Sequence, residues 1–208
     1  MTKIFFVRHG QTEWNLAMRY QGHADIQLTE LGKKQAQCVA DRLKKEPFSA
    51  IYCSDLIRAK DTALAIADYH KTPFTVTPLL REINFGEWEG LSYDAIHSSW
   101  PNEVERFFRA PGDVVIPGGE TCEALQKRVE TILREIITAH KDETVAVVTH
   151  GGAIRAALCD ALCMPINAFW HIRQDNTAVN QVVYYPEDKR AVVELVNDTN
   201  HLSALQIR

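Results

Sequence analysis

Two arginines and two histidines stand at or just beyond the ends of short apolar runs, where a buried sheet rarely has cations. They are Arg8, His9, Arg58 and His150. Such side chains are poor choices for sheet ends packed against apolar layers, so a hydrophobic core explains none of them. One histidine after a strand indicates little, because such residues are usually structural. Four residues in equivalent places indicate one shared site that binds an anion.

The residue types around this site favour phosphate as the anion. Guanidinium groups match a tetrahedral oxyanion with paired hydrogen bonds. Gly151 and Gly152 follow His150, and their backbone N–H groups can approach a ligand closely at the positive end of the next helix. A carboxylate would need fewer donors than this set offers. We therefore expect a phosphate-binding site.

Three apolar runs predict strands that bring these side chains together. They cover residues 3–7, 49–53 and Thr144–Thr149, and the last is rich in β-branched residues, as in a strand covered on both faces. In open α/β sheets, ligands bind beyond the carboxyl ends of the strands. The segments that follow the three runs should therefore meet at one edge of the sheet.

The remaining pattern alternates helices with strands. Helices are expected over about 29–45, 54–67, 121–140 and 153–163, with Thr29 capping the first and Ser54 or Asp55 the second. Further strands are expected over Phe74–Thr77, 180–185 and 191–197. This alternation predicts an α/β fold, a three-layer α/β/α sandwich with a mainly parallel sheet.

The chain shows no linker, repeat or shift in composition, so we expect a single domain over residues 1–208. Residues 92–119 are rich in aromatic and turn residues and are predicted to form a cap-like excursion over the body rather than a core element. Trp100, Phe107 and Phe108 in this segment either line a substrate pocket or pack against the body, and the sequence does not favour one role.

Composition excludes several classes of function. The chain has 208 residues, 46% of them hydrophobic, with 23 Lys and Arg against 27 Asp and Glu, a net charge of −4. This is typical of a globular protein and gives no basic field for nucleic acid. No apolar stretch is long enough to span a bilayer or to form a signal peptide, so no membrane association is expected. Five cysteines without a CxxC pair predict reduced thiols and a cytoplasmic location.

The site residues also carry a resemblance to a known family. Arg8-His9-Gly10-Gln11-Thr12 followed by Asn15 resembles the R-H-G-x-T-x-x-N signature of the histidine phosphatase superfamily, also called phosphoglycerate-mutase-like. The resemblance continues through the blocks at 28–32, 54–59, 81–90, 117–120 and 149–152, and so covers nearly the whole chain. It implies the phosphoglycerate-mutase-like fold, and no metal or cofactor.

The resemblance implies a role for each site residue. His9 corresponds to the nucleophile, which is phosphorylated transiently, while Arg8, Arg58 and His150 correspond to the groups that hold the phosphate. The adjacent arginine charges are expected to lower the pKa of His9 and keep it neutral. Further binding positions implied for the substrate are Asn15, Gln21, Gly22 and Gly151.

Glu82 corresponds to the general acid of the family, which protonates the leaving group and then activates water. A bound phosphate dianion would favour its protonated form. Without the motif, an ordinary ion pair between Glu82 and a nearby arginine would be the simpler interpretation. Glu87 and Glu89 are expected to be surface or structural carboxylates.

The resemblance leaves three functions to distinguish. Related mutases carry a longer insertion and extra cations after the block that ends at Gly90, whereas no lysine occurs here between Lys71 and Lys127. This favours a metal-independent phosphomonoester hydrolase acting on a small molecule, similar to broad-specificity and α-ribazole phosphatases. A cofactor-dependent phosphoglycerate mutase and a non-catalytic protein that binds a phosphorylated ligand are the alternatives.

Overall fold

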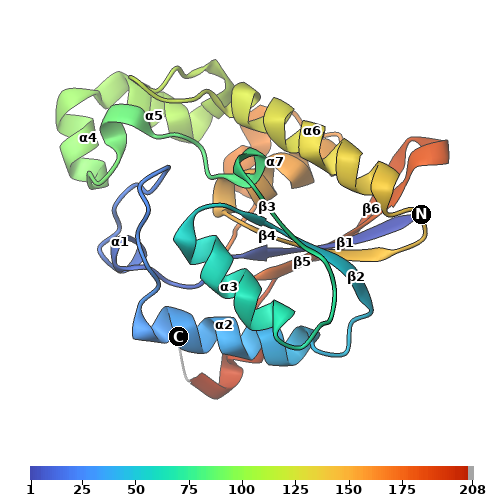
Figure 1. Ribbon diagram of the computed structural model, residues 1–208. Coiled ribbons are helices and arrows are strands. Elements are labelled where there is room, and N and C mark those ends of the chain that lie inside the picture. The colour runs from blue at the N-terminus through green and yellow to red at the C-terminus, as the bar shows by residue number, and fades with distance from the viewer. Residues whose placement is uncertain (206–208) are drawn as a thin grey trace.

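A six-stranded sheet with the order β3-β2-β4-β1-β5-β6 forms the centre of the computed structural model, which describes residues 1–205 (Figure 1). Neighbouring strands pair in parallel from β3 to β1, and β5 pairs antiparallel with both β1 and β6. The strands are β1 (Thr2–Arg8), β2 (Phe48–Ser54), β3 (Phe74–Thr77), β4 (Thr144–Thr149), β5 (Val179–Tyr185) and β6 (Arg190–Asp198). The predicted mainly parallel sheet is confirmed.

Helices cover both faces of this sheet. On one face lie α2 (Glu30–Leu43) and α3 (Ile57–Ala67), and on the other α6 (Cys122–Ala139) and α7 (Gly151–Ala161) (Figure 1). Short 3-10 helices occur at Pro78–Leu80, Gly86–Trp88, Pro111–Asp113, Ile166–His171, Pro186–Asp188 and Asn200–Leu205. The predicted three-layer sandwich is confirmed. In the described part of the chain, no helix is both long and apolar enough to cross a membrane.

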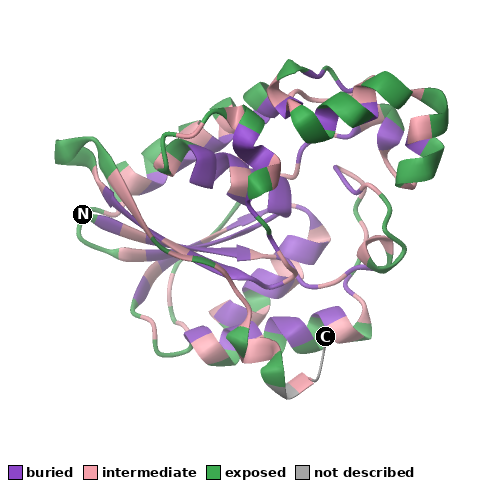
Figure 2. Ribbon diagram, turned by 180° about the vertical axis from the view of Figure 1, so that it is seen from behind, coloured by how far each residue is buried: buried purple, intermediate pink, exposed green. Residues whose placement is uncertain are grey.

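The central strands explain why their sequences are almost continuously apolar. Val145 and Val147 of β4 join the core under α6 and α7, whereas Ala146 and Val148 join the core under α2 and α3. Successive side chains of a strand point to opposite faces, so both faces of β4 must be apolar. Figure 2 shows the strands and the inner helix faces as buried and the outer helix faces as exposed.

The predicted cap of α3 is wrong. The helix begins at Ile57, and the side chain of Asp25 accepts a hydrogen bond from the Ile57 N–H at 2.7 Å, so a distant loop supplies the cap. Asp55 instead pairs with Arg81, with an N–O distance of 2.6 Å. α7 begins at Gly151, two residues before the predicted start, because His150 is already its N-cap residue.

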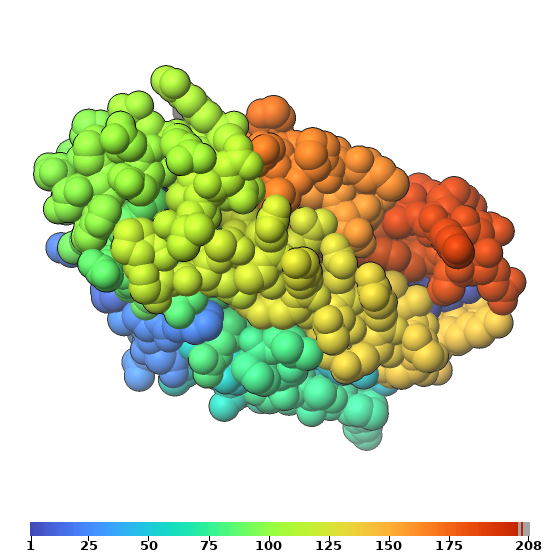
Figure 3. Space-filling view, turned by 90° about the horizontal axis from the view of Figure 1, so that it is seen from above, coloured from blue at the N-terminus to red at the C-terminus, as the bar shows by residue number. Residues whose placement is uncertain are grey.

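The prediction that residues 92–119 lie outside the core is also wrong. They contain α4 (Tyr93–Ser99) and α5 (Pro101–Arg109), and Ile96, Val104 and Phe107 on these helices belong to the core under α6 and α7. Figure 3 shows the segment in green beside the yellow surface of α6. The sequence analysis predicted neither α4 nor α5, and it also missed the short helix α1 (Glu13–Leu16), which the Thr12 and Asn15 side chains cap reciprocally.

Candidate active site

His9 lies directly after β1, at the carboxyl edge of the sheet, and is 3% exposed. Its Nδ1 is 2.7 Å from the carbonyl oxygen of Gly10. Because a carbonyl only accepts, Nδ1 carries the ring proton and Nε2 keeps its lone pair. Burial, followed by the charges of Arg58 and Arg8, lowers the pKa of His9 well below its usual value. The ring is therefore neutral and able to act as a nucleophile.

His150 follows β4, and its ring centroid is 5.1 Å from that of His9. The two strands are parallel neighbours, with Arg8 opposite Thr149, so the register itself brings the histidines together. The pKa of His150 is also well below its usual value, first through burial and then through the charge of Arg58. A neutral imidazole at this place can donate one hydrogen bond to a ligand.

Two guanidinium groups flank the histidines and are held by backbone carbonyls. Arg58 is fully buried, donates from Nη1 to Ala24 at 2.8 Å and from Nη2 to Gly22 at 2.7 Å, and has a pKa lowered to about 10 by burial. Arg8 donates from Nη1 to the Gln174 carbonyl at 2.6 Å. These bonds hold both side chains in place before a ligand binds.

Buried polar atoms without a partner gather around His9. Within residues 1–205 nine such side-chain atoms occur, and five belong to this site: Nε of Arg8 and Arg58, both ring nitrogens of His150, and Nε2 of Gln21. Leaving such an atom unpaired costs about 1–3 kcal/mol, so their concentration is a property of the site rather than of the fold. The set is rich in donors and suits a ligand with several acceptor oxygens, such as phosphate.

A cavity of about 310 Å³ opens in front of His9. Its lining includes the predicted residues Arg8, His9, Asn15, Gln21, Glu82 and Gly151, together with residues from α1, α5, α7 and the loop before β5. Arg58, His150 and Gly22 are not among its lining residues. Phe108 lines the cavity, but Trp100 and Phe107 do not and instead pack in the core. The volume suits a small molecule.

Glu82 faces the same cavity and is anchored by the backbone. Its Oε2 accepts from the Gly152 N–H at 3.0 Å, and its Oε1 accepts from the Ile83 N–H at 2.9 Å. Among the described residues it forms no ion pair, and the neighbouring Arg81 is paired with Asp55. The alternative interpretation of Glu82 as an ordinary ion-pair partner is therefore wrong. Glu89 is structural, as expected, because it accepts from the His23 and Ala24 backbone N–H groups.

Arg128 of α6 fixes the segment that carries Glu82. It donates to the carbonyl oxygens of Leu79, Arg81 and Glu82 at 2.7–2.9 Å and pairs with Glu120. One side chain thus provides hydrogen-bond donors for three backbone carbonyl groups within residues 79–82. The sequence analysis did not find this residue, because the contact depends on how α6 packs.

Asn15 and Gly22 have local roles beside the cavity. Asn15 accepts from the Thr12 N–H and from the Asn176 side chain, both at 3.1 Å, which orients its amide. A Cβ at Gly22 would lie 2.7 Å from backbone atoms of Ile83 and Phe85, so only glycine fits there. Gly22 therefore serves the site through its carbonyl group, which holds Arg58.

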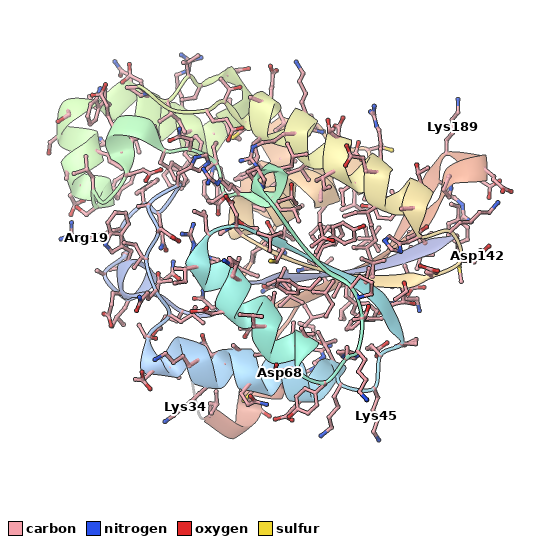
Figure 4. The ribbon with its side chains drawn as sticks, viewed as in Figure 1. Arg19, Lys34, Lys45, Asp68, Asp142 and Lys189 are labelled. Carbon is pink, nitrogen blue, oxygen red and sulfur yellow. The ribbon has the colours of Figure 1, made fainter. Side chains whose placement is uncertain are left out.

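Sequence reasoning missed five residues of the cavity wall: Met18, Arg19, Tyr20, Arg155 and Trp170. Arg155 had a signal, since it stands four residues after Gly151 and so shares its face of α7. Arg19 lies between the α1 loop and α4, at the opposite end of the molecule from Asp142 and Lys189 (Figure 4). No cluster of three His, Cys, Asp or Glu residues within 1–205 is arranged to hold a metal ion.

Comparisons with known proteins agree with this geometry. The family model of the histidine phosphatase superfamily (branch 1) matches residues 4–199. A metal-independent phosphoserine phosphatase of Arabidopsis thaliana is 38% identical over 208 residues, covering 99% of this chain and 85% of that protein. Phosphoglycerate mutase-like protein 4 of the same plant is 43% identical over 157 residues, covering 74% and 68%. The solved structure of Bacillus stearothermophilus YhfR superposes with a TM-score of 0.92 at 30% identity, covering 97% and 100%.

Proposed function

We infer that this chain, which belongs to the histidine phosphatase superfamily (branch 1), performs its chemistry with His9 as the nucleophile. The protein is a phosphoric monoester hydrolase of that family. One observation carries the assignment of the site: five unpartnered buried polar atoms surround a neutral histidine whose Nε2 lone pair is available. A phosphoryl group beside Nε2 would accept hydrogen bonds from the arginine Nε–H groups and from the one ring N–H of neutral His150.

In the first step, Nε2 of His9 forms a bond to phosphorus as the bond from phosphorus to the ester oxygen breaks. The leaving oxygen takes a proton from the Glu82 carboxyl group. Arg8, Arg58 and His150 donate to the three oxygens of the transferring group and stabilise the charge that they share. Because Gln174 holds Arg8, and Gly22 and Ala24 hold Arg58, little reorganisation of the two guanidinium groups is needed.

In the second step, water attacks the phosphohistidine. The Glu82 carboxylate accepts the proton of that water, the N–P bond breaks, and inorganic phosphate leaves with His9 neutral again. One carboxyl group thus gives a proton in the first step and takes one in the second. Its anchoring by Gly152 and Ile83 keeps it at one place through both steps.

We propose a small phosphomonoester as the substrate, with phosphoserine as the first compound to test. The cavity volume of about 310 Å³ supports a small molecule. The relative from Arabidopsis that matches nearly the whole chain is named a metal-independent phosphoserine phosphatase. The same family relation supports turnover without a metal ion.

The positions of the cations favour hydrolysis over a mutase reaction. A mutase must hold a second phosphate, which requires further cations from the cap. Arg106 and Arg109 of α5 do not line the cavity, and Arg106 donates instead to the Asp113 carbonyl. Residues 92–119 therefore contribute an aromatic ring, Phe108, rather than a charge.

Two wider expectations belong with this proposal. We propose that residues 1–208 form one domain of the family, since both core clusters share the same sheet. We also propose a cytoplasmic enzyme, supported by five unpaired cysteines, of which Cys53 and Cys122 have pKa values raised to about 12 by burial.

The test compares hydrolysis with phosphoryl transfer. The protein is incubated with phosphoserine or p-nitrophenyl phosphate, with and without EDTA, and separately with 3-phosphoglycerate plus 2,3-bisphosphoglycerate. We expect inorganic phosphate from the first two substrates at a rate that EDTA does not change. Rapid formation of 2-phosphoglycerate would assign a mutase instead, and binding of phosphate esters without turnover would assign a non-catalytic role.

A further inference from the structure

Arg155 is a fixed cation in the cavity wall that the proposed two-step reaction does not use. Its Nε donates to the Ile172 carbonyl at 2.7 Å. Its guanidinium carbon lies 4.8 Å from the ring centroid of Trp170 and 5.5 Å from that of Phe169. A guanidinium held on aromatic faces in this way gains cation–π stabilisation, and its two terminal nitrogens remain available for a ligand.

The aromatic platform under Arg155 is itself rigid. The indole N–H of Trp170 donates to the Phe107 carbonyl at 2.6 Å. Phe107, Phe108 and Phe169 all pack against the Trp170 ring with centroid distances of 5.0–5.4 Å. Little conformational entropy is therefore lost when Arg155 binds an anion.

Arg155 and Arg8 converge on one glycine. A Cβ placed on Gly151 would lie 3.0 Å from Nη1 of Arg155 and 3.5 Å from Nε of Arg8. Neither arginine forms an ion pair among the described residues, and burial lowers the pKa of both, that of Arg155 to about 10. Asp175 acts on both from a distance but is paired with Arg173.

The charges of the site exceed what one phosphate neutralises. Arg8, Arg19 and Arg155 line the cavity, the charge of the buried Arg58 acts on His9, and Glu82 is the single carboxylate among the described lining residues. In the first step Glu82 is protonated, so a phosphate dianion neutralises two of the four positive charges and leaves an excess of positive charge at the site. A carboxylate beside the phosphate lowers this excess and matches the two terminal nitrogens of a guanidinium.

We propose that Arg155 binds a carboxylate of the substrate, next to the phosphate held by Arg8, and so selects phosphomonoesters that also carry a carboxyl group. The proposal rests on the proposed phosphatase function and specifies its substrate class. Removing the carboxylate from the substrate and removing the charge from Arg155 should break the same interaction. Arg155→Gln should therefore have little effect on a substrate that lacks the carboxylate.

The test uses two substrates that differ only in this group, L-phosphoserine and phosphoethanolamine. Arg155→Gln should lower kcat/KM for phosphoserine about 10- to 100-fold, mainly through KM, which is the range for a lost hydrogen bond to a charged group. The loss with phosphoethanolamine should be severalfold smaller. Arg155→Lys keeps the charge without the paired donors and should recover part of the preference. Arg173→Gln, an exposed arginine outside the cavity, is the matched control.

Two results would overturn the proposal. If Arg155→Gln lowered kcat/KM equally for both substrates, Arg155 would bind the phosphate or stabilise the fold instead. If only Arg19→Gln removed the preference for phosphoserine over phosphoethanolamine, Arg19 would be the residue that binds the carboxylate. Calorimetric titration of His9→Ala with the same two compounds measures the preference without turnover. An inactive wild-type protein that still binds phosphoserine through Arg155 would refute the phosphatase function and keep this subsite.

Discussion

The carboxylate of Glu82 accepts a hydrogen bond at 3.0 Å from the backbone N–H of Gly152, in the first turn of α7. This contact joins the segment after β3 to the helix that follows His150. It places the proposed acid at the positive end of a helix and beside the cavity. The proton donor and the phosphate-binding residues are therefore held by the same structural element.

Glu82→Gln should slow the hydrolysis of esters whose leaving group needs a proton more than that of esters whose leaving group does not. Gln has nearly the same shape but no proton to give to an alkoxide, whereas nitrophenolate leaves without one. We expect kcat for phosphoserine to fall about 100-fold or more, within the range for general acid catalysis, and kcat for p-nitrophenyl phosphate to fall far less. Steady-state kinetics with the two esters measures this, and equal losses would exclude the acid role.

Gly152→Ala should reproduce part of this defect without touching the carboxyl group. A Cβ at this position would lie within contact distance of Glu82 Oε1, so the carboxylate must move. The selectivity for p-nitrophenyl phosphate over phosphoserine should rise, as in Glu82→Gln. Gly112→Ala, outside the cavity wall, serves as a control for a glycine replacement. Unchanged kinetics in Gly152→Ala would show that the position of Glu82 is not critical.

Arg128→Lys should loosen the segment that carries Glu82. Lysine keeps the charge beside Glu120 but cannot also bond three carbonyl groups, and each buried acceptor left without a donor costs about 1–3 kcal/mol. We expect a lower free energy of unfolding in urea and a lower kcat. Arg134→Lys changes an exposed residue six positions further along α6 and should alter neither quantity. An Arg128→Lys variant with the free energy of unfolding and the kcat of the wild-type protein would contradict the positioning role.

Acid should destabilise the protein over a pH range that depends on the pKa values of its buried histidines. The pKa values of His9 and His150 are lowered well below 6.5 in the folded state, so the unfolded state binds more protons below pH 6.5. Stability therefore falls as the pH drops from about 6.5, by up to about 1.4 kcal/mol per pH unit for each histidine.

Urea unfolding at pH 5.0, 5.8 and 6.5 measures this slope. Glutamine does not titrate, so in His150→Gln about one proton fewer should be taken up on unfolding. The stability should then depend less steeply on pH. His171→Gln, at an exposed position, should leave it unchanged. The account of neutral buried histidines fails if the stability of the wild-type protein is constant over this range.

The sequence predicted the sheet and the convergence of the site for a physical reason. Strands covered on both faces must be apolar, and the carboxyl ends of parallel strands meet at one edge, so Arg8, His9 and His150 had to come together. The nucleophile and acid roles came instead from the family resemblance. Pattern alone could not tell a nucleophilic histidine from a structural one.

What the sequence did not predict depends on contacts between distant elements. Asp25 caps α3 from another loop, and Arg128 reaches the Glu82 segment across the packing of α6. Residues 92–119 seemed too rich in turn residues for a core role, but the apolar faces of α4 and α5 are short and continue the core of α6. The periodicity of a local sequence does not predict which distant residues it contacts.

The central claim is that His9 carries the phosphoryl group covalently, and rapid quenching of the enzyme during turnover of ³²P-labelled phosphoserine tests it most directly. The account predicts acid-labile ³²P on a peptide that contains His9 in the wild-type protein, and none in His9→Ala. Rapid turnover with no protein-bound ³²P at any quench time, or label on a residue other than His9, would contradict it.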